Sequence, residues 1–308
     1  MLNWLRRRVL RGYELLLRRE LSGAPTHVAI IQDGNRRYAR RNGADAPEGH
    51  RAGADTTEEV LDWCDELGVE ELTLYAFSTE NFNRPAVERE ALFDLLEEKL
   101  YEFADADRVH ESGVCIHAIG AIEKLPDRVQ EAVRYAERRT RGYDQFRLNI
   151  ALAYGGRTEL LGAARDVAEA VASGDLDPDA VDVTTIDRQL YERPIRDVDL
   201  IIRTGGDERT SNFLPWHANG NEAAVFFCAP YWPEFSKFDF LRAIRTYESR
   251  ADSWRRTRAM RAVALVRAVA SAELDEAREV ATRLRETLPS GEEGMVEELE
   301  AGEAEPAD

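Results

Sequence analysis

Lysine is almost absent from this chain of 308 residues. Lys99, Lys124 and Lys237 are the lysines among 41 basic residues, whereas 59 residues are acidic, and the formal net charge is -18. This charge argues against nucleic acid as a general partner, because a duplex-binding surface needs a basic excess. Two explanations of the acidity stay open: the surface of a cytoplasmic protein from a high-salt organism (a halophile), where charge is screened, or an ordinary acidic protein.

Cysteine pairs and long apolar runs are also missing. Cys64, Cys115 and Cys228 lie far apart in apolar stretches and form no CxxC pair, so we expect buried thiols instead of disulfides or zinc ligands. No apolar run is long enough to span a membrane, and the N-terminus lacks the apolar core and cleavage site of a signal peptide. These absences predict a cytoplasmic protein.

Two nucleotide-binding signatures are absent as well. The loops contain neither GxxxxGK[ST] nor GxGxxG. Neither a kinase-like NTPase nor a dinucleotide-dependent dehydrogenase is therefore predicted.

The two ends of the chain differ from its middle. Residues 1–22 place leucines among arginines at near-helical spacing, which predicts a basic amphipathic helix that either lies on an anionic membrane surface or packs against the protein itself. Residues 290–308 are rich in Glu, Gly, Ala and Pro, a composition typical of a disordered acidic tail. Between them, 44% hydrophobic residues overall allow a large core, and we assign residues 23–289 to one main domain.

Strand and helix patterns alternate along this domain. Apolar runs that read as strands occur at residues 28–31, 71–77, 114–120, 145–153, 199–205 and 221–229. Amphipathic helices separate them, and the chain is mostly helical after residue 237. The alternation predicts an α/β fold: an open, mainly parallel, six-stranded sheet covered by helices on both faces, with an added N-terminal helix and a helical C-terminal region.

One stretch, HVAIIQDGNRRYARRNG, changes character where an apolar strand meets an arginine-rich turn. The turn DGN precedes a predicted helix, whose free N–H groups and positive dipole end suit an anion. A phosphate there would meet Arg36 and Arg37, while Asp33 suits a divalent cation. The pattern indicates a metal-assisted diphosphate site, although a plain strand-to-helix turn has the same sequence features.

Three further polar loops follow predicted strands, and the carboxyl ends of parallel strands share one edge of a sheet. They are STENFNRP, YGGR and TGGDERTSN. These loops contain Arg84 and Arg209, and Arg203 directly precedes the last of them. Together with Arg36 and Arg37 they provide more arginines than one phosphate needs and suggest two diphosphate-bearing ligands, unless each arginine pairs with a surface carboxylate. His50 is expected either to donate to a phosphate or to cap a helix.

Five segments carry long motifs: HVAIIQDGNRRYA, GHRAG, LYAFSTENFNRP, LNIALAYGGRTEL and DLIIRTGGDERTSNFLPWHANGNEAAVFF. In order and spacing they resemble the signature regions of the cis-prenyltransferases, the undecaprenyl diphosphate synthase family, over residues 26–245. The resemblance implies an enzyme that adds isopentenyl diphosphate sequentially to an allylic diphosphate, each new double bond being cis. It implies a homodimer that needs Mg²⁺, unrelated to the all-helical trans-synthases, whose DDxxD motif is missing here.

The resemblance also assigns roles to residues. Asp33 resembles the aspartate that binds Mg²⁺ and helps the allylic diphosphate depart, and Glu222 resembles a second metal ligand. The residues implied around that diphosphate are Gly34, Asn35, Arg36, Arg37, Tyr38 and His50. Those implied for the isopentenyl diphosphate headgroup are Arg203, Arg209, Thr210 and Ser211. Those implied to frame both substrates are Ser78, Thr79, Glu80, Phe82 and Arg84.

Two further positions concern the proton and the product. Asn81 matches the position assigned to proton removal; an amide is a poor base, so we expect Asn81 to orient a substrate or water, or the diphosphate itself to take the proton. Phe146 resembles the residue that closes an apolar tunnel and stops chain growth. As an alternative, Phe146 is ordinary core at the start of a strand.

The chain departs from the bacterial pattern in four places. Tyr38 and Phe82 stand where bacterial enzymes usually carry tryptophan, Ala46 where they carry a diphosphate-binding arginine, and Glu208 where they carry a histidine near the metal. The absence of that arginine at Ala46 fits an archaeal branch of the family. Resemblance to this branch implies a geranylgeranyl diphosphate primer and a long-chain, undecaprenyl-like product that becomes a glycosyl carrier lipid.

Two functions other than catalysis are alternatives for a chain with these motifs. Some relatives are catalytically silent scaffold subunits of a prenyltransferase complex, but the aspartate turn and the RTGG-R-S region both survive here. A generic anion-binding domain would bind phosphate without consuming isopentenyl diphosphate.

Overall fold

The computed structural model describes residues 18, 21, 23–191, 195–218 and 223–250. Most of the predicted N-terminal helix, the predicted metal ligand Glu222 and the predicted acidic tail lie outside these residues. In the described part, the helices are too short or too polar to cross a membrane.

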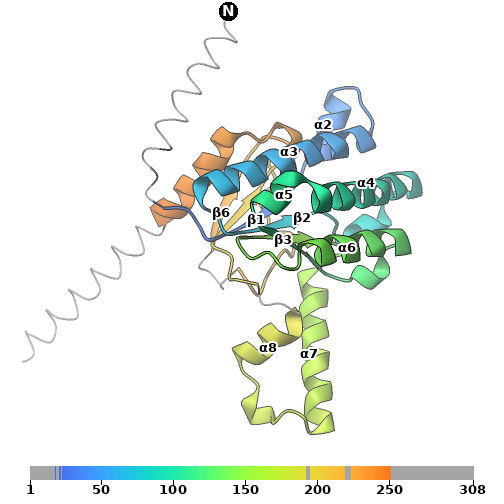
Figure 1. The fold of residues 1–308 in the computed structure, drawn as a ribbon, viewed down its shortest axis with the longest axis vertical. Coiled ribbons are helices and arrows are strands. Elements are labelled where there is room, and N and C mark those ends of the chain that lie inside the picture. Colours follow the sequence, from blue (N-terminus) through green and yellow to red (C-terminus); the bar gives the residue numbers. More distant parts are fainter. Residues whose placement is uncertain (1–17, 19–20, 22, 192–194, 219–222, 251–308) are drawn as a thin grey trace, which may run out of the picture. The chain divides into compact units, whose positions relative to one another are not determined.

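The described strands form one six-stranded sheet in the order β3-β4-β2-β1-β5-β6, and every neighbouring pair is parallel (Figure 1). The strands are β1 His27–Ile31, β2 Glu71–Tyr75, β3 Val114–Ile119, β4 Phe146–Ala151, β5 Leu200–Arg203 and β6 Ala224–Phe227. The predicted parallel sheet is confirmed. Because β1 lies between β2 and β5, the loops that follow these three strands meet at one edge, where parallel sheets bind their ligands.

Helices connect the strands. They are α2 Asn35–Arg41, α3 Ala46–Leu67, α4 Ala86–Asp105, α5 Asp107–Glu111, α6 Asp127–Thr140, α7 Gly156–Ser173 and α8 Val183–Leu190, and residues 237–250 are also helical. Short 3-10 helices are Thr79–Asn83 (η1), Ile122–Lys124 (η2), Pro178–Ala180 (η3) and Trp232–Glu234 (η4).

Helix α3 begins four residues before His50. The side chain of Asp45 accepts a hydrogen bond from the Glu48 N–H at 3.0 Å, and Pro47 occupies the first turn, where its missing N–H costs nothing. His50 therefore lies inside α3. The alternative that His50 caps a helix is wrong.

Alternate residues of each strand enter two different apolar clusters. On one face, Val28, Ile30 and Leu72 join a large cluster with residues of α3, α4 and α6. On the other face, Ala29 and Ile201 join a smaller cluster with Phe213, Leu214 and Tyr154. The larger cluster is the one that extends to the site described below.

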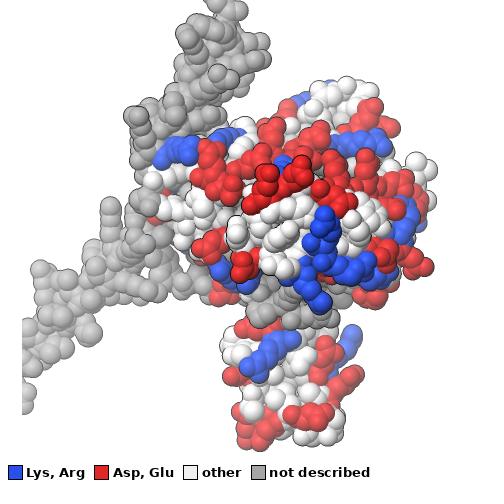
Figure 2. All heavy atoms as spheres, viewed as in Figure 1, with Lys and Arg blue, Asp and Glu red and all other residues white. Residues whose placement is uncertain are grey.

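Acidic side chains cover much of the face shown in Figure 2. Some of the described arginines pair with more than one carboxylate. The guanidinium of Arg128 on α6, for example, lies 2.7–3.3 Å from carboxylate oxygens of Glu90, Asp94 and Glu97 on α4. A network of this kind connects helices, although an isolated exposed pair contributes only about 0–1 kcal/mol.

Candidate active site

The turn between β1 and α2 needs its glycine. Gly34 has a φ of 105°, and a Cβ there would lie 2.7 Å from the ring of Tyr231. Thr204, directly after β5, fixes the next part of the turn: its hydroxyl donates to the Asp33 carbonyl at 2.7 Å and accepts from the Asp33 N–H at 3.0 Å. The backbone of Asp33 is thus held in place by the neighbouring strand.

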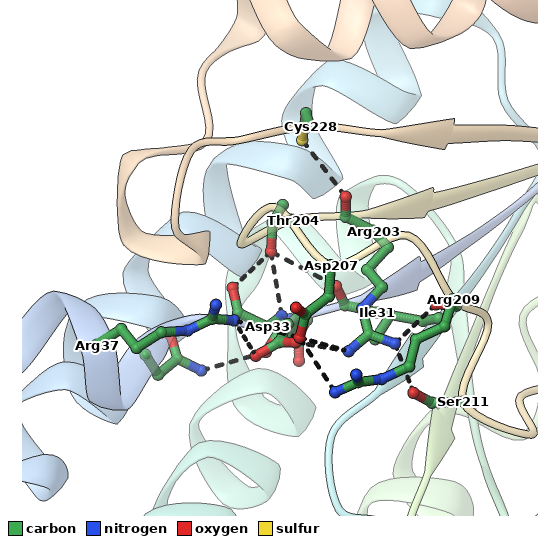
Figure 3. A network of polar contacts seen from close by, with 11 residues as sticks. Ile31, Asp33, Arg37, Arg203, Thr204, Asp207, Arg209, Ser211 and Cys228 are labelled. Atoms are coloured by element: carbon green, nitrogen blue, oxygen red, sulfur yellow. Dashed lines mark hydrogen bonds and ion pairs between the residues drawn. The ribbon is translucent and has the colours of Figure 1, made fainter.

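The carboxylate of Asp33 lies between two arginines (Figure 3). Arg203 Nη2 is 2.7 Å from Oδ2, and Arg37 Nη2 is 3.0 Å from Oδ1. Burial opposes ionisation of Asp33, but hydrogen bonds and charge from Arg203 and Arg37 outweigh it and hold its pKa below the ordinary value. Asp33 is therefore ionised at neutral pH.

Arg203 connects Asp33 to the loop that follows β5. This buried guanidinium donates to the Arg209 carbonyl at 2.7 Å and to the Ser211 hydroxyl. Asp207 Oδ2 lies 3.4 Å from Arg203 Nη2 and 3.1 Å from Arg209 Nη2, so both guanidinium groups donate to this carboxylate (Figure 3). Sequence reasoning missed Asp207, although it lies between the glycine pair and Arg209 in the same motif.

The same loop has an unusual backbone. Ser211, Asn212 and Leu214 have φ values of 48°, 59° and 45°, and Ala153 before the YGGR loop has 48°. Non-glycine residues adopt this conformation only where the surrounding structure enforces it, often at functional sites. Asn212 holds the loop in this conformation through two hydrogen bonds. Its backbone carbonyl accepts from the Gly156 N–H at 3.0 Å, and its side-chain Oδ1 accepts from the Arg157 N–H at 2.9 Å.

The loop Ser78–Arg84 forms η1. The Ser78 N–H donates to Asn81 Oδ1 at 3.0 Å, so the amide NH₂ is the part of Asn81 that can contact a substrate. The Thr79 N–H donates to the Tyr154 carbonyl at 2.9 Å, which attaches this loop to the YGGR loop. Phe82 packs edge-on against Phe77, with ring centroids 5.1 Å apart.

Glu88 of α4 gathers three of the predicted residues. Its Oε1 lies 2.9 Å from Arg84 Nη1, 3.3 Å from Arg36 Nε and 3.8 Å from His50 Nε2. Burial and then the charge of Arg84 lower the pKa of His50 to about 4, so neutral His50 can accept from Arg84 at 3.2 Å. Sequence reasoning missed Glu88, because nothing in the sequence separates it from other helix glutamates.

Two cavities meet at this edge of the sheet. The first has about 340 Å³ and is polar; its lining includes Asp33, Gly34, Asn35, Arg36, Arg37, His50, Arg84, Asp207 and Arg209. The second has about 110 Å³, lies among α3, α4 and the sheet, and is lined mainly by apolar side chains such as Leu74, Leu92, Leu96, Leu148 and Ile150. Gln32, Asn35 and His50 line both cavities, so the polar pocket and the apolar cavity adjoin at these residues.

Six further residues singled out in the sequence do not line either cavity. Tyr38 is half-buried on α2, Ala46 is the first residue of α3, and Glu80, Glu208 and Thr210 are exposed. Phe146 is buried in the larger apolar cluster, two residues before the cavity-lining Leu148.

A carboxylate beside a polar pocket suits one metal ion. The described residues contain no group of three His, Cys, Asp or Glu side chains that could hold a metal by themselves. Mg²⁺, however, is usually bound by one or two carboxylates together with substrate phosphates and water. Asp33, with Asp207 nearby, fits an ion that arrives with a diphosphate.

An arginine-rich pocket that adjoins an apolar cavity is the arrangement expected of an enzyme that acts on prenyl diphosphates. Residues 31–255 match the Prenyltransf family, described as undecaprenyl diphosphate synthase. The chain belongs to this family, and it is a transferase of the cis-prenyltransferase type.

Individual relatives agree. The chain is 66% identical over 287 residues to a tritrans,polycis-undecaprenyl-diphosphate synthase (geranylgeranyl-diphosphate specific) of Haloarcula marismortui, covering 93% of this chain and 94% of the relative. A protein of the same name from Halobacterium salinarum is 66% identical over 291 residues, covering 94% and 96%. Among solved structures, lavandulyl diphosphate synthase from Lavandula x intermedia, crystallised with dimethylallyl diphosphate, is 32% identical with a TM-score of 0.66, covering 73% of this chain and 95% of that one.

Proposed function

We propose that this enzyme condenses isopentenyl diphosphate sequentially onto geranylgeranyl diphosphate, each new double bond being cis, and releases a long-chain, undecaprenyl-like polyprenyl diphosphate that is a precursor of a glycosyl carrier lipid. The primer and product are those in the names of the relatives from Haloarcula and Halobacterium. Family membership supports the reaction type.

The observation that carries the proposal is that the two cavities adjoin. A prenyl diphosphate has a multiply charged head on an apolar tail, and the cavities offer arginines in one and leucines in the other. Asn35 and His50, where the cavities join, would then lie near the bond between the diphosphate and the first carbon of the tail. On this placement, the diphosphate of the allylic substrate would lie in the polar pocket.

The residues of the polar pocket suit departure of the diphosphate. Carbon–oxygen cleavage concentrates negative charge on the leaving group, and Arg36, Arg37 and Arg84 are fixed donors that stabilise this charge more than the charge of the ground state. Asp33 would hold Mg²⁺ against the diphosphate, and the ion would supply further stabilisation of the departing charge. Glu88 would keep Arg36 and Arg84 in position.

Isopentenyl diphosphate would bind beside the allylic diphosphate, where the loop after β5 borders the polar pocket. Arg203 and Ser211 already contact each other there, and Arg209 joins them through Asp207. Asn81, with its oxygen bonded to Ser78, would orient the isopentenyl group, while a diphosphate oxygen takes the proton.

The test uses purified protein in high salt with Mg²⁺, isopentenyl diphosphate and either geranylgeranyl or farnesyl diphosphate. We expect mass spectrometry to show a series of products that differ by one isoprene unit, formed faster from geranylgeranyl diphosphate and absent after the metal is chelated. Phosphate binding without consumption of isopentenyl diphosphate would support the scaffold or the anion-binding alternative.

We also propose that the enzyme is a cytoplasmic homodimer adapted to high salt, with its N-terminal segment in contact with the membrane surface. The net charge of -18 supports the salt adaptation, and the amphipathic pattern of residues 1–22 supports the membrane contact. Light scattering in high salt and flotation with anionic vesicles, with and without residues 1–22, test these points separately.

A further inference from the structure

The wall of the apolar cavity contains a lysine. On α4, Leu92, Leu96 and Phe103 face the cavity at helical spacing, and Lys99 occupies one position of the same row. Of the described side chains that line this cavity, Lys99 alone carries a permanent charge, because His50 is neutral at physiological pH. The chain has three lysines in all, so the placement of one of them here is notable.

Lys99 connects the two helices that enclose the cavity. Its Nζ lies 3.1 Å from Glu58 Oε1 on α3 and 2.7 Å from Glu102 Oε2 on α4. The other oxygen of Glu58 lies 3.2 Å from Arg108 Nη2 on α5. The Lys99 and Glu58 side chains are mostly covered, 20% and 32% exposed, so solvent screens this pair less than an exposed one. An ion pair thus links α3 to α4 beside the cavity.

The cavity is too small for a long product. Its volume is about 110 Å³, whereas pockets that bury a drug-sized ligand have about 300–1,000 Å³. A hydrocarbon that grows between the sheet and helices α3 and α4 would therefore require the two helices to move apart. The pair of Lys99 and Glu58 resists this movement, because separating the partners would leave an ammonium against an apolar chain.

We propose that the ion pair between Lys99 and Glu58 is a determinant of product length: growth stops when further elongation would require this pair to break. The inference rests on the proposed function and adds to it a residue that selects the product. The methylene stem of Lys99 lines the cavity while its ammonium stays paired at the margin, a division that lysine side chains readily adopt.

The experiment compares product lengths of Lys99→Met, Glu58→Gln and Lys99→Arg with those of the wild type. Lys99→Met keeps an unbranched apolar stem without the charge, and it should increase the fraction of products longer than the main wild-type product at least fivefold. Glu58→Gln should shift the distribution in the same direction, while Lys99→Arg should stay close to wild type. Chromatography of the dephosphorylated products gives these fractions.

Lys237 provides a matched control. It also pairs with a glutamate of α3, Glu66, but it does not line the cavity. Lys237→Met should leave the product distribution unchanged. An equal shift in Lys237→Met and Lys99→Met would overturn the proposal, since any loosening of α3 would then suffice.

A binding measurement separates this inference from the proposed function. By calorimetry, the affinity for a C40 polyprenyl diphosphate relative to geranylgeranyl diphosphate should rise at least fivefold in Lys99→Met. A wild type that makes no polyprenyl diphosphate would refute the proposed function. An unchanged affinity ratio, or an unchanged product distribution in an active Lys99→Met enzyme, would refute the role of Lys99.

Discussion

The polar pocket and the apolar cavity are neighbours, but they are built in different ways. The pocket takes most of its charged side chains from two short stretches: Asp33 with the first turn of α2, after β1, and Asp207 with Arg209, after β5. His50 of α3 adds to them. The cavity takes its lining from single residues spaced along α3, α4, β2 and β4. A few contiguous motifs can thus specify the charged end of a substrate, whereas the tail depends on helix packing.

This difference predicts that the two regions can be altered separately. Changes in the pocket should affect rate and substrate affinity without changing product length. Changes along the cavity should affect product length and leave the first condensation nearly unchanged.

The largest effect is expected for Asp33→Ala. Loss of the carboxylate removes the proposed metal ligand and leaves Arg37 and Arg203 without their shared partner, so turnover should fall at least about 1,000-fold, or about 4 kcal/mol of barrier. The measurement is a steady-state rate with Mg²⁺, and a thermal melt should show that the variant is folded. More than about a tenth of the wild-type rate in the variant would contradict the role of Asp33.

A smaller effect is expected for Arg209→Ala. This guanidinium is exposed and is shared with Asp207, so its removal should spare the fold and raise the Michaelis constant for isopentenyl diphosphate about 10- to 100-fold, the value of a charge-assisted hydrogen bond. The constant for the primer should change far less. Arg203→Ala should show the same preference with an added loss of turnover, because Arg203 also holds Asp33. Equal effects on both substrates would mean that the two diphosphate sites have been exchanged.

Phe146→Ala tests the cavity at the next position of β4. Ile150 and Leu148 line the cavity. Phe146 lies on the same face of β4, about 6.6 Å further from the polar pocket than Leu148. Its removal should lengthen the products by one or two isoprene units with little change in the first condensation, at a stability cost of about 3–5 kcal/mol. Chromatography of dephosphorylated products decides this, and an unchanged distribution from an active variant would place the end of the tunnel elsewhere.

The smallest effect on catalysis is expected at Glu159, outside both cavities. Burial raises the pKa of this carboxyl from 4.5 to about 7, although the hydrogen bond from the Tyr154 hydroxyl, at 2.6 Å, opposes the shift. As the pH rises from about 4.5 to 7, the unfolded chain loses this proton and the folded chain keeps it, so the free energy of unfolding falls by about 3 kcal/mol and is then constant. Glu159→Gln should remove this slope in denaturation experiments at pH 5 and pH 8, while activity at neutral pH changes less than about twofold. Identical slopes in the two proteins would show that the carboxyl ionises normally in the folded chain.

The fold was predictable because each strand is a short apolar run that ends in polar or glycine residues. Val28 to Ile31 and Leu200 to Ile202 are buried on both sides, as strands inside a parallel sheet must be, and helices of regular spacing separate such runs. The order of the strands was not readable, because it depends on how the helices pack and not on any local pattern.

The candidate site was predictable in its loops but not in its pairs. Asp33 and Arg203 lie 170 positions apart, and no local pattern shows that they share a hydrogen bond. The acidic partners Glu88, Asp207 and Glu58 were harder still, since they are three of 59 acidic residues and differ from the others only in where the fold places them. The roles of Asn81 and Phe146 remain predictions.

The three cysteines have a practical consequence. Cys64, Cys115 and Cys228 are all buried, and burial raises the pKa of the Cys64 thiol and raises that of Cys228 to about 12, so these groups react slowly with thiol reagents. A cysteine introduced on the outer side of α3 and another on α4 could therefore carry a pair of spin labels in the otherwise native sequence. The distance between the labels, measured with primers of increasing length, would report directly how far the two helices separate during growth.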